Sequence, residues 1–335
     1  MAVGARVNVL TVNAGSSSLK LALVVHGRVE REYADLDAAL AGPAPDAVGH
    51  RVVHGGPRTS PVVVDDRVRR ELQALVDLAP LHQPPALAAL DACRSAWSGV
   101  TQVACFDTAF HATIPPAAST YALPAAWRAA GVRVYGFHGL SVAWVVSRLP
   151  MLAPGARRVL VAHLGSGSSL TAVVDGRSVA TTMGFTPSDG LVMGTRSGAV
   201  DPLAVLWLAR SRGLGVDELA DGLERSSGLL GLAGTADFAE LLRRADDPAD
   251  GRAVLALGVW WHRLVVLAGG MVAAMGGVDA VVLTGGIGEH AEAVRVGLAE
   301  RLGWLRVGGA VPLVVTPARE DLQLASEVEG LLGRE

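Results

Sequence analysis

The sequence predicts an α/β protein in which one strand-hairpin module is used twice. Residues 7–34 read as strand, loop, strand, turn and strand, and the same order returns over residues 158–181. Helical spacing of apolar residues occupies segments between and after these strands, at 66–78, 86–97, 201–213, 237–244 and 252–274. Mixed strands and helices give the α/β class, and a repeated module predicts a duplicated domain.

The repeat is visible residue by residue. At an offset of 150, five residues of the first module match five of the second: Val9, Leu10, Gly15, Ser16 and Ser18 face Val159, Leu160, Gly165, Ser166 and Ser168. The turns, His26-Gly27 and Asp175-Gly176, align after a shift of one residue. Each module therefore predicts a hairpin whose small-residue loop follows its first strand.

Length and composition narrow the class of protein. The chain has 335 residues, of which 50% are hydrophobic and 18% charged, so we expect two well-buried domains. A net charge of -3 gives no basic excess for nucleic acid. Cys93 and Cys105 lack C-x-x-C spacing, which predicts neither zinc nor a disulfide. The apolar run Leu264–Met275 is too short to span a membrane, and residues 1–15 lack a signal-peptide pattern, so we expect a cytoplasmic protein.

Three Gly/Ser loops, each directly after an apolar strand, suit phosphate groups. They are residues 13–18, 165–168 and 285–288. Glycine lets backbone N–H groups approach an anion, and serine hydroxyls add donors. The chain contains no G-x-x-x-x-G-K-[ST], and no G-x-G-x-x-G follows the first strand. Hairpin loops in two similar halves instead predict the actin and sugar-kinase type of fold, with nucleotide in the cleft between domains.

Charged side chains near these loops are candidate catalytic or anion-binding residues. Lys20 is the one lysine among 29 basic residues and follows the first loop. Arg51 in GHRVVHGG and Arg196 in MGTRSG sit among glycine and apolar residues, where a guanidinium can grip carboxylate or phosphoryl oxygens. The alternative for each arginine is a structural ion pair, with Asp46 or Asp201 respectively.

Histidines and carboxylates complete the set of candidates. Most of the nine histidines are expected to be core or turn residues, and His138 and His163 are the exceptions because each borders a glycine loop. Asp107 follows the apolar strand TQVACF, as either a magnesium ligand or a helix cap. Glu289 and Glu320 lie near loops and equally fit a solvated surface.

The motifs together resemble the acetate kinase family. TVNAGSSSLK, GHRVVHGG, FDTAFHATIP, YGFHG, HLGSGSS, MGFTPSDGLVMGTRSG, SGLLG and GGIGEH occur in that family's order from residue 8 to about 325. The resemblance implies duplicated actin-like, ribonuclease H-like domains with an interdomain cleft. It also implies the reversible, Mg²⁺-dependent and direct in-line transfer of the γ-phosphoryl group of ATP to acetate, with Mn²⁺ as an alternative metal.

The resemblance also implies roles for particular residues. The catalytic groups are Arg51, Asp107, His138 and Arg196. Arg51 and an apolar pocket bind the substrate, the pocket being Val53, Leu81, Phe137 and Pro187. The metal ligands are Asn13, Asp107 and Glu320. The ATP and phosphate contacts are Asn13, Ser16, Ser18, Lys20, His163, Gly165, Ser166, Gly167, Asp237, Phe238, Gly285, Gly286, Ile287 and Gly288.

Several positions depart from the family's pattern. The segment between Lys20 and Arg51 is shorter than usual, so the first domain is expected to be trimmed. Leu140 and Val142 replace a hydroxyl and an imidazole, and Ala239 replaces an arginine of the adenosine site. The expected domains are 1–110, completed by 321–335, and 111–320, with a homodimer through the second. The alternatives are a kinase for propionate or another short-chain acid, and a homologue that binds nucleotide without turnover.

Overall fold

The computed structural model describes residues 7–15 and 19–333, which form two compact units. Unit 1 consists of Met1–Ala112, Phe137–Ser147 and Arg319–Glu335, and unit 2 of Thr113–Gly136 and Arg148–Ala318. The C-terminal segment groups with the N-terminal residues. Residues 111–112, 137–147 and 319–320 were expected in the second domain and group with unit 1.

Unit 1 is built on a six-stranded sheet with the order β3-β2-β1-β4-β6-β5. β1 pairs antiparallel with β2 and parallel with β4, and β4 pairs parallel with β6. The strands are β1 (Val9–Ala14), β2 (Leu19–Val25), β3 (Arg28–Tyr33), β4 (Ala47–Val52), β5 (Val62–Val63) and β6 (Thr101–Phe106). The carboxyl ends of β1, β4 and β6 therefore meet at one edge of the sheet.

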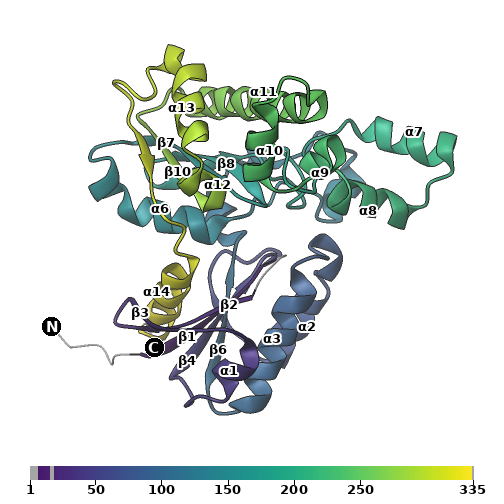
Figure 1. Cartoon of the computed structure of the whole chain (residues 1–335). Coiled ribbons are helices and arrows are strands. Elements are labelled where there is room, and N and C mark those ends of the chain that lie inside the picture. Colours follow the sequence, from purple (N-terminus) through teal and green to yellow (C-terminus); the bar gives the residue numbers. More distant parts are fainter. Residues whose placement is uncertain (1–6, 16–18, 334–335) are drawn as a thin grey trace. The chain divides into compact units, whose positions relative to one another are not determined.

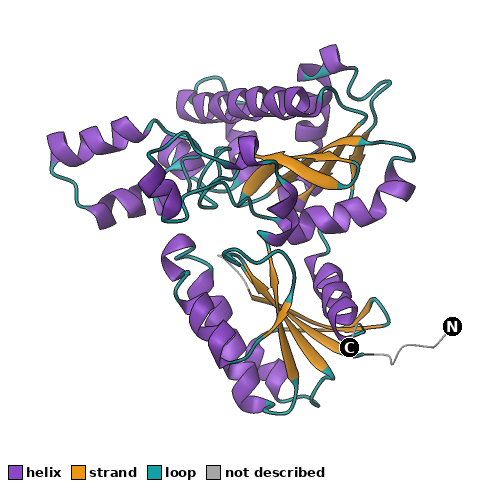
Figure 2. Ribbon diagram, turned by 180° about the vertical axis from the view of Figure 1, so that it is seen from behind, coloured by secondary structure: helices purple, strands orange, loops and turns teal. Residues whose placement is uncertain are grey.

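Helices cover both faces of this sheet (Figure 2). α14 (Glu320–Leu332) packs on the face that carries Val9 and Cys105, and α3 (Gln83–Ala96) packs on the face that carries Leu10 and Val48. Alternate residues of each strand thus enter two separate cores, as the period of two requires. Unit 1 also contains α1 (Leu36–Leu40), α2 (Asp66–Gln73), the first part of α6 (Gly139–Leu152), and the 3₁₀ turns Val76–Leu78 and Ala109–Thr113.

Unit 2 repeats the arrangement with a five-stranded sheet of order β11-β10-β7-β8-β9 (Figure 1). Its strands are β7 (Arg158–Leu164), β8 (Ser168–Val174), β9 (Arg177–Thr181), β10 (Ala280–Thr284) and β11 (Leu313–Val315). Its remaining elements are α4 (Pro116–Ser119), α5 (Ala125–Ala129), α7 (Pro202–Arg212), α8 (Val216–Arg225), α9 (Gly228–Ala233), α10 (Phe238–Ala245), α11 (Gly251–Met275), α12 (Gly285–His290), α13 (Glu292–Arg301) and the 3₁₀ turn Gly303–Leu305.

The predicted duplication is confirmed in detail. β1-β2-β3 and β7-β8-β9 are equivalent antiparallel meanders, and the turn between the second and third strands of each has two residues in the left-handed region, His26-Gly27 and Asp175-Gly176. The register shifts at matching points of β2 and β8, between Leu23/Val24 and between Ala172/Val173. In each unit the next two strands along the sheet then add parallel to the first.

An aspartate before the inner parallel strand recurs in both units. Asp46 precedes β4 and accepts the N–H of Asn8 at 2.7 Å, and Asp279 precedes β10 and accepts the N–H of Arg158 at 2.8 Å. Asp279 also accepts the Arg157 N–H at 3.1 Å and pairs with the Arg158 guanidinium at 2.6 Å. Each aspartate thereby ties the first residue of one strand to the start of its neighbour, which fixes the register of the pair.

α11 (Gly251–Met275) is the longest helix among the described residues, and one of its faces is buried in unit 2. Its 25 residues pack on β8 and β9 through Trp260, Leu264 and Ala268, within the largest buried cluster. By length and composition the whole of α11 could cross a membrane, whereas its C-terminal part, Leu264–Met275, is too short when taken alone. Its packing in the core accounts for the apolar side chains on its buried face.

We predict that Asp279→Asn lowers the free energy of unfolding by about 1–2 kcal/mol at neutral pH, because a charged acceptor of several N–H donors is lost. Hydrogen bonding to Arg158 lowers the pKa of Asp279 from 3.8 to about 2. The carboxylate therefore stabilises the fold fully above pH 4, and this contribution disappears as the pH falls from 4 towards 2. Urea unfolding of both proteins across this range measures it.

Asp175→Asn is the matched control, since Asp175 pairs with Arg157 at an exposed site and asparagine accepts its left-handed conformation. We expect a change below about 0.5 kcal/mol for this variant. An equal effect of both substitutions, or a difference that persists at pH 2, would contradict the role assigned to Asp279.

Candidate active site

The candidate residues divide between the two units. Unit 1 carries Asn13, Ser16, Ser18, Lys20, Arg51, Val53, Leu81, Asp107, Phe137, His138 and Glu320. Unit 2 carries His163, Gly165, Ser166, Gly167, Pro187, Arg196, Asp237, Phe238, Gly285, Gly286, Ile287 and Gly288. Ser16 and Ser18 lie outside the described residues, and Lys20 is an exposed residue of β2 opposite Asn13 of β1.

Arg51 is the centre of a buried polar cluster in unit 1. Its Nε and Nη2 donate to both oxygens of Asp107, with Nη2 at 2.7 Å from Oδ2. Its Nη1 donates to Asn13 Oδ1 at 2.9 Å and lies 3.6 Å from Glu320 Oε2. Asn13 Nδ2 in turn donates to Glu320 Oε2 at 2.8 Å. The strand ends of β1, β4 and β6 and the start of α14 thus bring four predicted residues together.

The structure partly decides between the alternatives that the sequence left open for Arg51. Arg51 does form an ion pair, but with Asp107 and Glu320 rather than with Asp46, which accepts a backbone N–H instead. Burial opposes the charge on Arg51, yet the two carboxylates outweigh it and raise the pKa of the guanidinium. Burial raises the pKa of the Asp107 carboxyl, and the neighbouring guanidinium opposes that rise. The cluster therefore concentrates one positive and two negative groups within one buried space.

His138 reaches the candidate site on a strained segment. It has φ +60° and is buried, directly before α6. Gly139 donates its N–H to the carbonyl of Asp107 at 2.9 Å, and a Cβ on Gly139 would overlap that carbonyl oxygen. A left-handed non-glycine residue costs energy and persists only where its surroundings hold it. α6 therefore begins against the end of β6 and holds His138 near Asp107.

Two of the three predicted pocket residues of unit 1 are buried. Val53 and Phe137 are 2% and 1% exposed, and Leu81 is half-buried. Phe137 meets the ring of His54 edge-on at 5.7 Å between centroids. Its carbonyl accepts from His111 Nε2 at 2.9 Å, and burial lowers the pKa of His111 to about 4, so this imidazole is a neutral support.

Gln83 is a support that the sequence analysis did not assign. Its side chain accepts the N–H of His54 at 3.3 Å and donates to the carbonyl oxygens of His54 and Leu72. It thereby ties the segment after β4 to α2 and α3. Leu140 and Val142, the residues that replace polar groups of the family's pattern, are both fully buried on α6.

Arg196 lies in unit 2 on the irregular segment between β9 and α7. It is 5% exposed, and its Nη1 donates to the carbonyl of Pro187 at 3.1 Å and lies 3.6 Å from Met193 Sδ. Asp201, the expected structural partner, caps α7 by accepting the Leu203 N–H. Pro187 is buried in the same segment, so unit 2 brings these two predicted residues together.

Tyr121 and Asp189 hold this segment, and sequence reasoning missed both. Tyr121 Oη accepts the Phe185 N–H at 3.1 Å, and a Cβ on Gly184 would overlap the Tyr121 hydroxyl and the Asp189 carboxylate. The Gly184 carbonyl accepts the N–H of Tyr135 at 3.0 Å. No spacing in the sequence marks the contacts of Tyr121 and Tyr135, because each joins residues more than 45 positions apart.

The glycine loops of unit 2 follow two adjacent parallel strands. β7 leads into Gly165–Gly167, and β10 leads into Gly285, which has φ +78°. A Cβ on Gly285 would lie 2.7 Å from the Leu164 carbonyl oxygen and 3.1 Å from His163 Nε2. Residues 285–288 were expected to form a loop but begin the short helix α12. Gly286 is exposed with open space beside it, so this backbone is accessible.

The predicted adenosine residues lie at the start of α10. Asp237 caps the helix by accepting the N–H groups of Ala239 at 2.8 Å and Glu240 at 3.1 Å. Phe238 is buried and packs on Trp260 of α11, with 4.6 Å between ring centroids. The structure thus gives both residues a local structural role, and Ala239 is exposed on the first turn.

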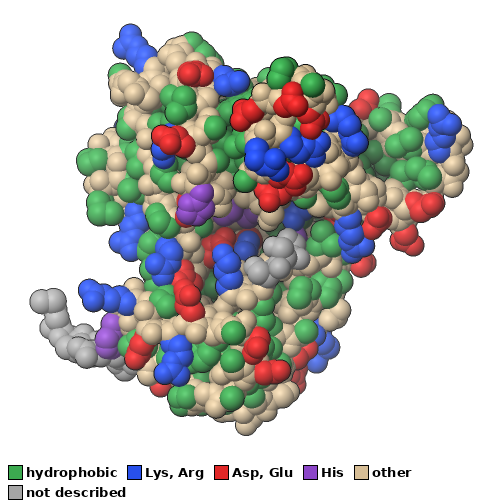
Figure 3. All heavy atoms as spheres, in the orientation of Figure 1, with side chains coloured by type: hydrophobic (Ala, Val, Ile, Leu, Met, Phe, Trp, Pro, Cys, Tyr) green, Lys and Arg blue, Asp and Glu red, His purple; other side chains and the backbone are tan. Residues whose placement is uncertain are grey.

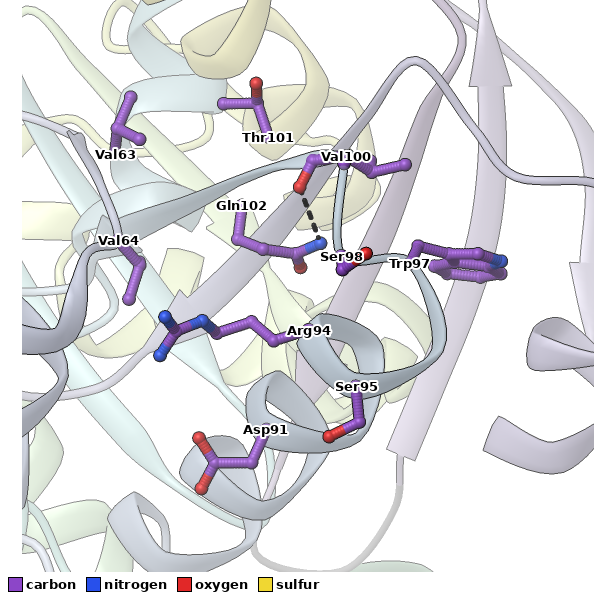
Figure 4. Close-up of a pocket in the computed structure, with 11 residues that line it drawn as sticks. Val63, Val64, Asp91, Arg94, Ser95, Trp97, Ser98, Val100, Thr101 and Gln102 are labelled. Carbon is purple, nitrogen blue, oxygen red and sulfur yellow. Dashed lines mark hydrogen bonds between the residues drawn. The ribbon is translucent and has the colours of Figure 1, made fainter.

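A separate cavity of about 650 Å³ lies at the opposite edge of the unit 1 sheet, near the start of β6 (Figure 4). Arg94, Asp91 and Gln102 line it, and Gln102 donates to the Val100 carbonyl at 3.1 Å. His50 meets Gln102 through Nε2 at 2.8 Å, and burial lowers the pKa of His50 to about 4. None of the predicted site residues lines this cavity.

A metal site among the described residues would combine the side-chain amide of Asn13 with the carboxylates of Asp107 and Glu320. In residues 7–15 and 19–333, no three His, Cys, Asp or Glu side chains gather as a metal site. Asp107, Glu320 and Asn13 do converge on Arg51, and all three offer the oxygen atoms that Mg²⁺ prefers. This donor set fits magnesium.

Comparisons with known proteins agree with this geometry. The model of the acetokinase family matches residues 43–310. An acetate kinase of Rhodopseudomonas palustris (strain TIE-1) is 47% identical, over 84% of this chain and 76% of its own. An acetate kinase of Deinococcus radiodurans is 40% identical, over 97% of this chain and 98% of its own.

Solved structures confirm the predicted fold class. A propionate kinase from Francisella tularensis has a TM-score of 0.85 and 32% identity, covering 96% of this chain and 98% of its own. An acetate kinase from Porphyromonas gingivalis has a TM-score of 0.84 and 30% identity, covering 97% and 100%. With most of its length matched in sequence and in structure, the chain belongs to the acetokinase family.

Proposed function

We propose that this chain is an acetate kinase, which transfers the γ-phosphoryl group of ATP to acetate and gives acetyl phosphate and ADP. The observation that carries the proposal is the buried cluster of Arg51, Asp107, Asn13 and Glu320 at one edge of the unit 1 sheet. A guanidinium there can hold a carboxylate, and the oxygen groups beside it can hold a metal–phosphate complex.

The chemistry needs charge neutralisation more than proton transfer. Acetate is already an anion at neutral pH, so its oxygen can attack the γ-phosphorus in line without a general base. Arg51 and Arg196 are each almost fully buried, where their charge acts strongly on developing negative charge. We assign His138 to the same task, as a hydrogen-bond donor to the transferring group.

We propose Mg²⁺, with Mn²⁺ as an alternative, held by Asp107, Glu320 and Asn13. When bound, the ion supplies charge that neutralises the phosphate oxygens. The residues of the chain orient the guanidinium that meets the substrate. Asp107 and Asn13 fix the guanidinium of Arg51 by four hydrogen bonds, so that its remaining N–H groups, which lie in the same plane, meet the substrate in one orientation.

We propose that ATP binds unit 2, at the loops Gly165–Gly167 and Gly285–Gly288, with His163 between them. Two loops after adjacent parallel strands suit a chain of phosphates, because their N–H groups face the same edge. The adenosine then lies towards Asp237 and Phe238. In this arrangement unit 1 binds the carboxylate substrate and unit 2 binds ATP.

We also propose a cytoplasmic homodimer without nucleic-acid or membrane partners. Both cysteines are buried free thiols, which fits a reducing compartment. α7 carries Leu203, Leu206 and Trp207 on one face, exposed by 68%, 46% and 54%, and buries no residue (Figure 3). A second copy of the chain is the occupant that the family resemblance implies for such a face.

The deciding experiment is a hydroxamate assay for acetyl phosphate with purified protein, ATP, Mg²⁺ and acetate. We expect product with the wild type, and a fall in kcat of about a hundredfold or more in Arg51→Ala and Arg196→Ala. Arg94→Ala, in the distant cavity, is the control and keeps normal turnover. Absence of product from the wild type would favour a homologue that binds nucleotide without turnover, and near-normal arginine variants would refute the assigned roles.

The acid preference follows from the size of the pocket. Val53 is buried directly after β4, where we place the acyl group, so we expect acetate to be best, propionate weaker and butyrate poor, and Val53→Ala to shift kcat/KM towards propionate by about tenfold. The control is Val52→Ala, whose side chain lies in the core on the other face of β4. A wild-type preference for propionate, the substrate named for the similar Francisella tularensis structure, would replace acetate in our proposal.

The dimer makes a separate prediction. Leu203→Glu together with Trp207→Glu places two charges on the apolar face of α7, so we expect a dimeric wild type to become monomeric in sedimentation experiments. Val296→Glu introduces the same charge at an exposed valine of α13 and leaves the dimer intact. A wild type that sediments as a monomer would show that α7 has no such partner.

A further inference from the structure

We propose that the hydroxyl of Thr284 donates a hydrogen bond to a phosphate oxygen of the bound nucleotide. Thr284 ends β10, immediately before the Gly285–Gly288 segment, and none of the roles assigned above includes it. The inference rests on the proposed nucleotide site of unit 2 and adds a specific donor to it. Three independent features of the structure support it.

The first feature is an unsatisfied hydroxyl. Thr284 is fully buried, and its Oγ1 has no hydrogen-bond partner. Its backbone precedes α12 as an N-cap, yet the side chain makes no capping bond. A buried hydroxyl without a partner costs free energy, and such groups in folded proteins call for an explanation. A ligand that supplies the missing acceptor is one.

The second feature is the position of Thr284 in its sheet. It pairs with His163 of β7, and His163 pairs with Ser169 of β8. Residues directly opposite one another in a sheet point to the same face, so these three polar side chains form one row. The row lies at the strand ends that lead into both glycine loops. The Thr284 side chain therefore lies beside His163, on the edge where we place the phosphates.

The third feature is the equivalent position in unit 1. Asp46 and Asp279 make the same contact before β4 and β10, and counting five residues onward from each reaches Arg51 and Thr284. The rest of the row also corresponds, because Asn13 occupies the place of His163. In the function proposed above, the first module uses this position to hold a substrate anion, and Thr284 is its counterpart in the second module.

The remaining condition is that a phosphate bound at the glycine segment comes close enough to the Thr284 hydroxyl. Gly285 has φ +78° and packs close to the Leu164 carbonyl, so the chain turns sharply after Thr284. Gly286, two residues beyond Thr284, is exposed and has open space where a side chain would be. A phosphate that approaches the Gly286 backbone therefore comes close to the end of β10 and its hydroxyl.

The test compares Thr284→Val, which has nearly the same shape without the hydroxyl, with Thr284→Ser, which keeps it. Binding of ADP with Mg²⁺ is measured by calorimetry, and Tm is measured without ligand. We expect Thr284→Val to raise the Kd for ADP about tenfold or more and to leave Tm unchanged or higher, because an unsatisfied buried group is removed. Thr284→Ser should bind ADP within about threefold of the wild type.

Thr171→Val is the matched control, because Thr171 is buried in the same sheet and its hydroxyl is bonded to Thr181 at 3.2 Å. We expect the opposite pattern there, a lower Tm with unchanged ADP affinity. The combination of weaker binding and undiminished stability in Thr284→Val is what a purely structural hydroxyl would not produce.

Three results would overturn the inference. They are wild-type ADP affinity in Thr284→Val, a lowered Tm or failure to fold in that variant, and equal loss of affinity in Thr284→Ser. A wild type that binds no ADP would instead refute the proposed nucleotide site itself, and the inference with it. The two kinds of failure are thus distinguishable from the wild-type titration alone.

Discussion

The buried guanidinium of Arg51 constrains the whole of unit 1. A charge that is only 9% exposed is strongly destabilising unless opposite charges and hydrogen-bond acceptors surround it. Asp107, Asn13 and Glu320 meet that need, and they come from the end of β6, from β1 and from the start of α14. The C-terminal helix must therefore pack across the N-terminal strands, which joins residues more than 300 positions apart. The same contacts gather a cation and oxygen ligands at one point.

The duplicated module explains why the two units differ in chemistry while sharing their architecture. The two sheets share the order of five strands, the same left-handed turn and the same register shift in the second strand, and the unit 1 sheet adds β5 at its edge. Equivalent positions, however, carry Arg51 in one unit and Thr284 in the other. A charged group suits a small carboxylate, whereas neutral donors and backbone N–H groups suit a chain of phosphates. In the function proposed above, residue identity at a few strand ends thus separates the two binding roles.

Much of the candidate site lies outside regular helices and strands. Arg196 and Pro187 belong to an irregular segment that hydrogen bonds from Tyr121 and Tyr135 hold in place. Gly139 is required by its close approach to the Asp107 carbonyl, which sets His138 in its left-handed conformation. Rigid positioning of such segments depends on tertiary contacts, so their geometry is sensitive to substitutions far from the reacting groups.

The sequence by itself determined the α/β class, the repeated hairpin and its turns, because strand periodicity and glycine-rich turns are local signals. The motifs also indicated Arg51 and Asp107 as a functional pair, though not that they bond to each other. Only the tertiary structure decided that Asn13, Asp107 and Glu320 all contact Arg51, that Gln83 and Tyr121 support the site, and that Thr284 lies beside His163. Those contacts depend on which strand ends become neighbours in the sheet, and strand order is fixed by packing of the whole unit rather than by any local pattern.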